Sequence, residues 1–266
     1  MDASTRPSNP LHDFTSSQAI TLITAVATLA TVLPLLLHLY HDYLAFLSLG
    51  PGGTPATITG FIRVKALSLA CLRDPYQAPP IPERFKGSQG YLVDFPVRHA
   101  PRPVTRGIAP HRQVTQRASK PIYDKLAQAI ERMGHEHADD LEIGTSCFEK
   151  HGTGLFSRAP AKRTCQGEIC HAHASDGSMH MTLHPADAKT VLEAGWAERH
   201  PIARGGWFER FVPGGFVMVY APREEREVEV VMRVVEAAAW FVRGGDGIVE
   251  GERRDSGIVP AEGDER

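Results

Sequence analysis

The sequence predicts an α+β fold, in which a mainly antiparallel sheet is packed with helices and is preceded by one N-terminal transmembrane helix. Three observations predict it. An uncharged apolar run covers residues 18–37. Segments with the two-residue period of strands follow, including a predicted hairpin at 142–156. Helical segments stand beside these strands in helix–strand–loop–strand–helix order, which is typical of α+β rather than parallel α/β domains.

Length and composition set the bounds. The chain has 266 residues, 42% of them hydrophobic, which suffices for a sizeable core. The formal net charge of −2 gives no support for nucleic-acid binding. The four cysteines are too few and too scattered for a disulfide scaffold, and they fit no standard zinc module. They are Cys71, Cys147, Cys165 and Cys170.

The apolar run is predicted to be a membrane anchor within residues 18–40, after a flexible N-terminus at 1–17. Twenty helical residues span about 30 Å, the hydrocarbon thickness of a bilayer. A cleaved signal peptide and a buried helix are the competing interpretations, but Arg6 is the only basic residue before the run. We therefore expect a single-pass protein that contacts the lipid bilayer through residues 18–37. Cysteines taken as unpaired and the lack of a glycosylation sequon favour an endomembrane location with a cytosolic body.

A catalytic domain is predicted over residues 41–243, followed by a disordered acidic tail at 244–266. Between the anchor and the tail, proline-rich residues 74–110 exclude helices and predict an extended strap. The predicted helices cover 59–72, 120–137, 185–194 and 222–243. The predicted strands cover 108–115, 142–150, 153–156, 178–184 and 216–220, with loops at 158–168, 196–201 and 203–215.

The segment 178–184 carries the most informative pattern. Met179, Met181 and Leu183 alternate with His180, Thr182 and His184. This is the period of a strand, so one sheet face would carry two imidazoles and the other would enter a core. Five of the thirteen histidines fall within residues 170–201. One histidine on a polar strand face is ordinarily only hydrogen-bonded, but the clustering beside Asp176 and Arg199 predicts a functional site.

Three blocks of this region resemble one known family. They read HAHASDGSMHMTLHPAD, AGWAERHPIA and GFVMVYAPREEREVEVV, and the earlier segments DYLAFLSLGPGG and GFIRVKALSLACL extend the likeness over nearly the whole chain. The chain resembles the luciferase domain of the fungal bioluminescence enzymes and their non-luminous homologues. Ala197 and His184 depart from the pattern of the luminous members. The resemblance therefore predicts the fold and the reaction class rather than light emission.

The resemblance implies an oxygenase that uses O2 as co-substrate and needs neither a metal nor a flavin. Its substrate would be a small aromatic molecule with an electron-rich hydroxy-α-pyrone of the 3-hydroxyhispidin type. O2 would add to the ring through an enolate, and a cyclic peroxide would then lose CO2. Ground-state O2 reacts slowly with closed-shell molecules, so removal of the enol proton is the step that a general base must assist, typically by about 10²–10⁴-fold.

We assign expected roles to nine residues on this basis. His180 is the predicted base, His200 the second acid or base, and Asp176 the group that orients a histidine. Arg223 is the predicted partner of the enolate or peroxide, with Arg199 as the alternative. The residues expected to border the substrate are His173, His184, Trp196, Arg199 and Tyr220.

Two other functions remain open at this point. His171 and His173 with His180 or His200 would supply three imidazoles, enough for a zinc or iron enzyme. The chain could also be a membrane-tethered module that binds a small molecule without turning it over. Metal analysis separates the first alternative from a cofactor-free oxygenase, and an assay with labelled O2 separates the second.

Overall fold

The computed structural model describes residues 16–99, 101–162, 164–210 and 212–245. The chain divides into two compact units, residues 1–48 and 49–266. The predicted flexible N-terminus at 1–17 and the predicted tail at 244–266 therefore lie almost wholly outside the described residues.

The described part of the first unit is a single helix, α1 (Ser16–Ser48). Residues 17–48 reach a mean hydropathy of 2.3, and the apolar window is 0% buried. Threonine hydroxyls along it donate to carbonyls four residues earlier, for example Thr24 to Ile20 at 2.9 Å, which removes their need for water. The helix is long and apolar enough to cross a membrane, although a signal sequence meets the same criteria. The helix extends past residue 40, where the predicted anchor ends, to Ser48.

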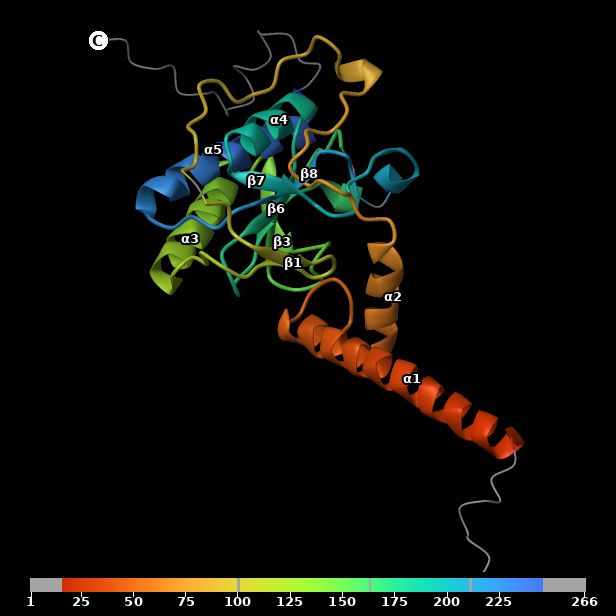
Figure 1. The fold of residues 1–266 in the computed structure, drawn as a ribbon. Coiled ribbons are helices and arrows are strands. Elements are labelled where there is room, and N and C mark those ends of the chain that lie inside the picture. Colours follow the sequence, from red (N-terminus) through yellow and green to blue (C-terminus); the bar gives the residue numbers. More distant parts are fainter. Residues whose placement is uncertain (1–15, 100, 163, 211, 246–266) are drawn as a thin grey trace, which may run out of the picture. The chain divides into compact units, whose positions relative to one another are not determined.

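The second unit contains an antiparallel sheet of six strands in the order β3-β4-β5-β6-β8-β7 (Figure 1). All five neighbouring pairs are antiparallel, which confirms the α+β prediction. The strands are β3 (Leu141–Thr145), β4 (Thr153–Ser157), β5 (Glu168–Ala172), β6 (Met179–Thr182), β7 (Ala197–Arg199) and β8 (Phe216–Val219). A separate hairpin pairs β1 (Thr105–Gly107) with β2 (His111–Gln113).

Three helices pack on one face of the sheet: α3 (Lys120–Glu136), α4 (Pro185–Glu193) and α5 (Glu225–Val242). The helix α5 contacts β5 and β6, α3 contacts β3 and α5, and α4 contacts β7. Met179 and Met181 of β6 point into this core, as their alternation predicts. The opposite face carries a smaller apolar cluster built around Phe216 and Ile108, on which side chains of α2 (Ile58–Ser68) pack. Both faces of the sheet are therefore covered.

Three strand predictions differ from the structure. The strand predicted over 142–150 ends at Thr145, because the chain then turns back and the amide of Lys150 donates to the carbonyl of Ser146 at 3.0 Å. The segments 158–168 and 196–201, predicted as loops, contain the start of β5 and the whole of β7. Both strands carry charged side chains that are nevertheless buried, and β5 also carries an imidazole, so a hydrophobic period does not reveal them.

Asp187 of α4 fastens the proline-rich strap to this core, and its titration yields a pH prediction. Its carboxylate accepts the amides of Leu92 at 2.8 Å and Tyr91 at 2.9 Å and is completely buried. Burial raises the pKa of Asp187 to about 6, against the opposing effect of the two amides. The native pKa thus exceeds the unfolded value of about 3.9. The stability that this group contributes is present below about pH 4 and is lost as the pH rises through about 6.

Asp187→Asn removes this titration. We expect the free energy of unfolding of the variant, minus that of the wild type, to rise by about 2–3 kcal/mol between about pH 4 and 7. Urea unfolding at several pH values measures it, with Asp124→Asn on the surface of α3 as the control. A difference that stays constant with pH would show that Asp187 is ionised throughout.

Candidate functional site

Five imidazoles form one buried group, which we call the histidine cluster. Each is between 2% and 6% exposed. They are contributed by β2, β5, β6 and the residues that follow β5 and β7. They are His111, His171, His173, His180 and His200.

The sheet register explains why residues from distant parts of the chain meet. His171 of β5 lies opposite His180 of β6, His180 lies opposite Met218 of β8, and Met218 lies opposite Glu198 of β7. Directly opposed residues of antiparallel strands project from the same face. One row across four strands therefore presents His171, His180 and Glu198 on the face away from helices α3–α5. Gly154 of β4 continues the row next to His171.

His180 is at the centre of the cluster. Its ring centroid lies 4.7 Å from that of His173, 5.3 Å from those of His171 and His200, and 5.5 Å from that of His111. Phe216 stacks on the His180 ring at 5.2 Å with an interplanar angle of 16°. Each of the other four imidazoles of the cluster therefore lies next to this one ring.

Three imidazoles lie in a linear series of close contacts, with a carboxylate at each end. Glu168 Oε1 lies 2.5 Å from His171 Nδ1, and His171 Nε2 lies 3.4 Å from His180 Nδ1. His180 Nε2 lies 3.3 Å from His111 Nδ1, and His111 Nε2 lies 3.1 Å from Glu198 Oε1. The chain thus runs from one acidic residue to the other through imidazoles alone.

His173 lies beside this series of imidazoles, next to His171 and His180. Its Nδ1 lies 2.9 Å from Ser178 Oγ, whose hydroxyl donates to Asp176 Oδ1 at 2.5 Å. Its Nε2 is buried and has no hydrogen-bond partner among the described residues. Glu149 approaches from the turn after β3, with Oε1 3.9 Å from both His171 Nε2 and His173 Nε2. The same carboxylate forms an ion pair with Arg112.

Burial keeps the central imidazoles uncharged. It lowers the pKa of His173 to about 4. It also lowers the pKa values of His180 and His200 well below the usual value, with further lowering by neighbouring histidines. Burial alone would raise the pKa of Glu198, but hydrogen bonds from His111, Thr105 and Tyr220 outweigh the effect and lower it. At neutral pH His173, His180 and His200 therefore each offer a nitrogen lone pair, and the Glu198 carboxylate is ionised.

A cavity of about 370 Å³ adjoins the cluster. Glu168 and Thr182 line it and connect it to the histidines, because Glu168 binds His171 and Thr182 lies two residues from His180 on the same strand. Its size falls in the range of small-molecule sites. Arg199 also lines the cavity, is 4% exposed, and has an Nε without a hydrogen-bond partner among the described residues. Burial lowers its pKa.

Most of the predicted site residues come together. His173, His180 and His200 belong to the cluster, and the Asp176 carboxylate lies 3.8 Å from His173 Nδ1. The Tyr220 hydroxyl donates to Glu198 at 3.0 Å, and Glu198 in turn contacts His111. His200 differs from the other four rings in that the backbone engages both of its nitrogens, through the carbonyl of residue 108 at 2.9 Å and the amide of residue 202 at 3.4 Å.

His184, Trp196 and Arg223 do not join the cluster. Strand β6 ends at Thr182, so the alternation stops there, and His184 caps helix α4 through the amide of residue 186. Its ring packs against Phe241 on the helical side of the sheet. Trp196 is a core residue whose indole donates to the carbonyl of residue 96 at 2.7 Å. The prediction that His184 shares a sheet face with His180 is therefore wrong, and Trp196 lies apart from the cluster.

Arg223 is held at the start of α5. Its guanidinium pairs with Glu227, one turn along the helix, and is about a third exposed. The pairing raises the pKa of Arg223. Of the two arginines considered from the sequence, Arg199 lines the cavity and Arg223 does not.

Sequence reasoning missed His111 and, of the acidic residues beside the imidazoles, all except Asp176. Glu198 lies within the GWAERHP block, and a charged residue in a buried strand is its only signal. Nothing local marks Glu149, Glu168 or His111, because tertiary contacts alone bring them to the site.

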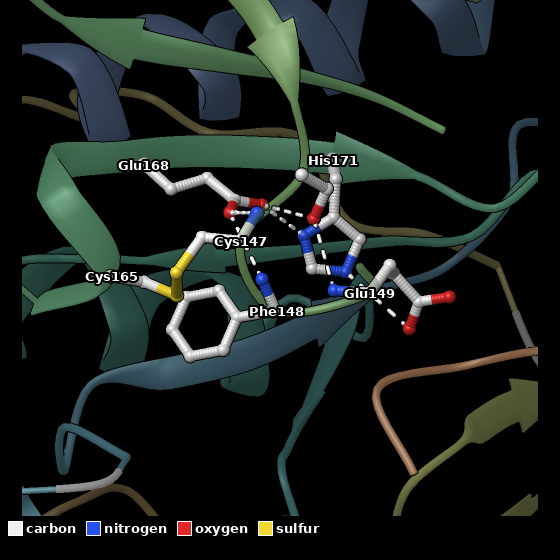
Figure 2. Close-up of a disulfide and its surroundings, with 7 residues drawn as sticks. Cys147, Phe148, Glu149, Cys165, Glu168 and His171 are labelled. Atoms are coloured by element: carbon white, nitrogen blue, oxygen red, sulfur yellow. Dashed lines mark hydrogen bonds and ion pairs between the residues drawn. A yellow bond between two sulfur atoms is a disulfide. The ribbon is translucent and has the colours of Figure 1, made fainter. Parts of the chain in front are cut away.

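A disulfide between Cys147 and Cys165 was also not predicted. Figure 2 shows it beside Glu168, with His171 lying between the carboxylates of Glu168 and Glu149. Glu168 Oε2 accepts the amides of Cys147 at 2.6 Å and Phe148 at 3.2 Å. The bond removes one basis for a cytosolic body, since the cysteines were taken as unpaired.

Comparison with known proteins agrees with this architecture. The luciferase domain family matches residues 166–238, which include β5–β8 and most of α5. The chain is 33% identical over 221 residues to the luciferase of Armillaria ostoyae, covering 76% of this chain and 80% of that protein. It is 33% identical over 224 residues, with the same coverage, to the luciferase of Neonothopanus nambi. No solved structure matches the chain significantly.

These luciferases are relatives across most of both sequences, and homology to them indicates an oxidoreductase that acts on a small molecule. The matched residues contain His171, His173, His180 and His200. The chain belongs to the fungal luciferase family.

Proposed function

We propose that this protein is an oxygenase that adds O2 to an electron-rich hydroxy-α-pyrone of the 3-hydroxyhispidin type. The ring hydroxyl loses its proton, and the resulting enolate donates electrons to O2. A carbon–oxygen bond then forms to give a peroxide. The peroxide cyclises and breaks down with release of CO2, so that substrate and O2 yield one oxidised product and CO2.

One observation carries this proposal: a buried cluster of imidazoles lies behind Glu168 and Thr182, which line a cavity of small-molecule size. An uncharged imidazole is able to accept a proton, and positioned bases contribute about 10²–10⁴-fold to such steps. His180, at the centre of the cluster, has the Glu198–His111 pair behind its Nε2. A proton entering the cluster is thereby stabilised by a carboxylate that is already ionised.

Arg199 is the proposed partner of the enolate. It is a buried cation on the cavity wall, and none of the ion pairs among the described residues includes it. Two of its guanidinium nitrogens donate to the carbonyls of Gln77 and Ala203, which hold the group in place without neutralising it. A developing negative charge in the cavity would therefore meet a preorganised positive charge.

We further propose that α1 attaches the protein to a membrane with its domain on the oxidising side. Disulfides persist in secretory compartments and are rare in the cytosol. An anchor and a signal sequence both deliver a chain to the secretory membrane, so either interpretation of α1 is consistent with the Cys147–Cys165 bond. This placement replaces the cytosolic body predicted from the sequence.

The decisive experiment supplies 18O2 to the full chain in detergent with a panel of hydroxy-α-pyrones and analyses products by mass spectrometry. We expect labelled oxygen in the product and release of CO2. Arg199→Gln should lower kcat/KM by about 10–100-fold, the equivalent of one hydrogen bond to a charged group. His135→Gln, on the exposed side of α3, serves as the matched control.

Binding of a pyrone without label in any product, by a folded wild-type chain, would exclude the oxygenase and favour a binding module. Equal kcat/KM for Arg199→Gln and wild type would remove Arg199 from the proposal and leave the oxygenase standing.

A further inference from the structure

The hydrogens available to the cluster do not suffice for its contacts. The chain from Glu168 through His171, His180 and His111 to Glu198 contains four close contacts, and each requires one hydrogen. Counted in their neutral forms, with one N–H each, the three imidazoles supply three hydrogens. Ionised carboxylates accept hydrogens most strongly, which assigns one to each end of the chain. One of the two imidazole–imidazole contacts is therefore left with two facing lone pairs.

The surroundings indicate which contact lacks its hydrogen. On the His111 side the nearest further imidazole is His200, and the backbone occupies both of its nitrogens. On the His171 side a further lone pair is present. The Ser178 hydroxyl donates to Asp176 and so accepts the hydrogen of His173 Nδ1. His173 Nε2 then carries a lone pair, and it is the buried atom without a partner.

A carboxylate oxygen completes the same small region. Glu149 Oε1 lies 3.9 Å from His171 Nε2 and 3.9 Å from His173 Nε2. His180 Nδ1 lies 3.4 Å from His171 Nε2, and all four atoms lie within 4.8 Å of one another. Three nitrogen lone pairs and one carboxylate oxygen thus converge with no hydrogen between them. Such an arrangement is repulsive unless a cation lies at its centre.

We propose that Glu149, His171, His173 and His180 bind a divalent first-row transition-metal ion. Donors that hold such an ion at about 2.0–2.2 Å in a tetrahedron lie about 3.3–3.6 Å apart, close to the separations found here. Imidazole with carboxylate is a donor set used for iron(II), zinc and related ions. It departs from the metal-free reaction that the family resemblance implies.

The groups behind the ligands fit this assignment. Glu168 receives the hydrogen of His171 Nδ1, and the Ser178–Asp176 pair receives that of His173 Nδ1. Such contacts fix the tautomer that directs a lone pair at a metal. Among the described residues, Arg112 is the arginine that pairs with a ligand carboxylate, that of Glu149. The carboxylates of Glu149, Glu168 and Asp176 outnumber it, so the local charge favours a cation.

The proposal that an ion binds is argued from these contacts alone. The role of the ion in catalysis rests on the proposed function. A metal ion lowers the pKa of a hydroxyl that binds to it and stabilises the resulting anion. With the ion bound, His180 would therefore promote the loss of the pyrone's proton as a metal ligand, instead of accepting the proton itself.

The test measures metal content directly. The full chain in detergent is freed of metal with a chelator, equilibrated separately with Fe²⁺ (without oxygen), Mn²⁺, Co²⁺ and Zn²⁺, and passed over a sizing column. We expect about one tightly bound ion per chain for at least one metal, a visible Co²⁺ spectrum of imidazole ligation, and a higher melting temperature. His173→Gln should abolish stoichiometric binding. Glu168→Gln should weaken it by about 10–100-fold, as loss of a supporting carboxylate typically does.

Two controls keep the result specific. His135→Gln lies on the exposed side of α3, and His200→Gln removes a cluster imidazole whose nitrogens are engaged by the backbone. Both should retain the ion. If the folded wild type binds none of the four metals, the proposal is overturned. An extra proton on the imidazoles would then supply the missing hydrogen. Equal metal content in wild type and folded His173→Gln would overturn it too. Should His173→Gln fail to fold, the Co²⁺ spectrum of the wild type decides instead, and a spectrum without imidazole ligation overturns the proposal.

The two proposals can fail separately. An ion bound with no 18O in any product would contradict the oxygenase and not the metal site. Full oxygenation by the metal-free chain would contradict the catalytic part of the ion and not the oxygenase.

Discussion

His180→Ala is expected to reduce oxygen consumption with a hydroxy-α-pyrone by about 10²–10⁴-fold, the usual contribution of a positioned proton acceptor. The reason is the central place of this ring, which contacts His111, His171, His173 and His200. Its loss breaks the path from the cavity side to Glu198 and removes one donor of the metal set. An oxygen electrode measures the rate.

Substrate binding should survive the same substitution. The cavity wall is formed by other residues, including Arg199 and Thr182, so the dissociation constant of the pyrone should change little. Fluorescence quenching of the tryptophans measures it, and His135→Ala serves as the control for oxygen uptake. Uptake at the wild-type rate by a folded His180→Ala chain would remove this residue from the mechanism.

Removal of the disulfide is expected to be the most damaging change to stability. Replacing both Cys147 and Cys165 with serine should lower the free energy of unfolding by about 3 kcal/mol, because the bond closes a loop of 18 residues that the unfolded chain would otherwise explore. The effect should extend to the site. The closed segment carries Glu149, and the turn that presents it is held by Glu168 through the amides of Cys147 and Phe148 (Figure 2).

Urea unfolding compares the double variant with the wild type, and metal content is measured on the same samples. Cys71→Ser is the matched control, because Cys71 is a free cysteine and forms no part of the cluster. A reductant added to the wild type should reproduce the double variant, whereas it should leave the double variant itself unchanged. Equal unfolding free energies for the double variant and Cys71→Ser would contradict the prediction.

The sequence allowed the fold class and the centre of the site to be predicted, and the reasons are local. Met179 and Met181 alternate with His180 and Thr182 within one strand, so a two-residue period reveals which side chains share a face. The helices over 120–137 and 185–194 carry apolar positions at helical spacing and begin near prolines, and both agree with α3 and α4 within one residue at each end.

The rest depended on contacts between distant segments. Glu198 reaches the histidines only because β8 inserts between β6 and β7, an order that no local pattern encodes. His111 comes from the β1–β2 hairpin, some sixty residues before β5. The prediction for His184 is wrong because it extends the strand period past Thr182. Strand β6 ends at Thr182, and His184 caps the start of α4 instead.

Glu168 takes part in three different regions of the structure. One carboxylate supports the turn beside the disulfide, bonds to His171, and forms part of the cavity wall. A substitution at residue 168 alone would therefore disturb the turn, the bond to His171 and the cavity wall together. We expect homologues that have lost the cysteine pair to carry coordinated replacements at 168 and 171, so that these four positions are inherited as a set.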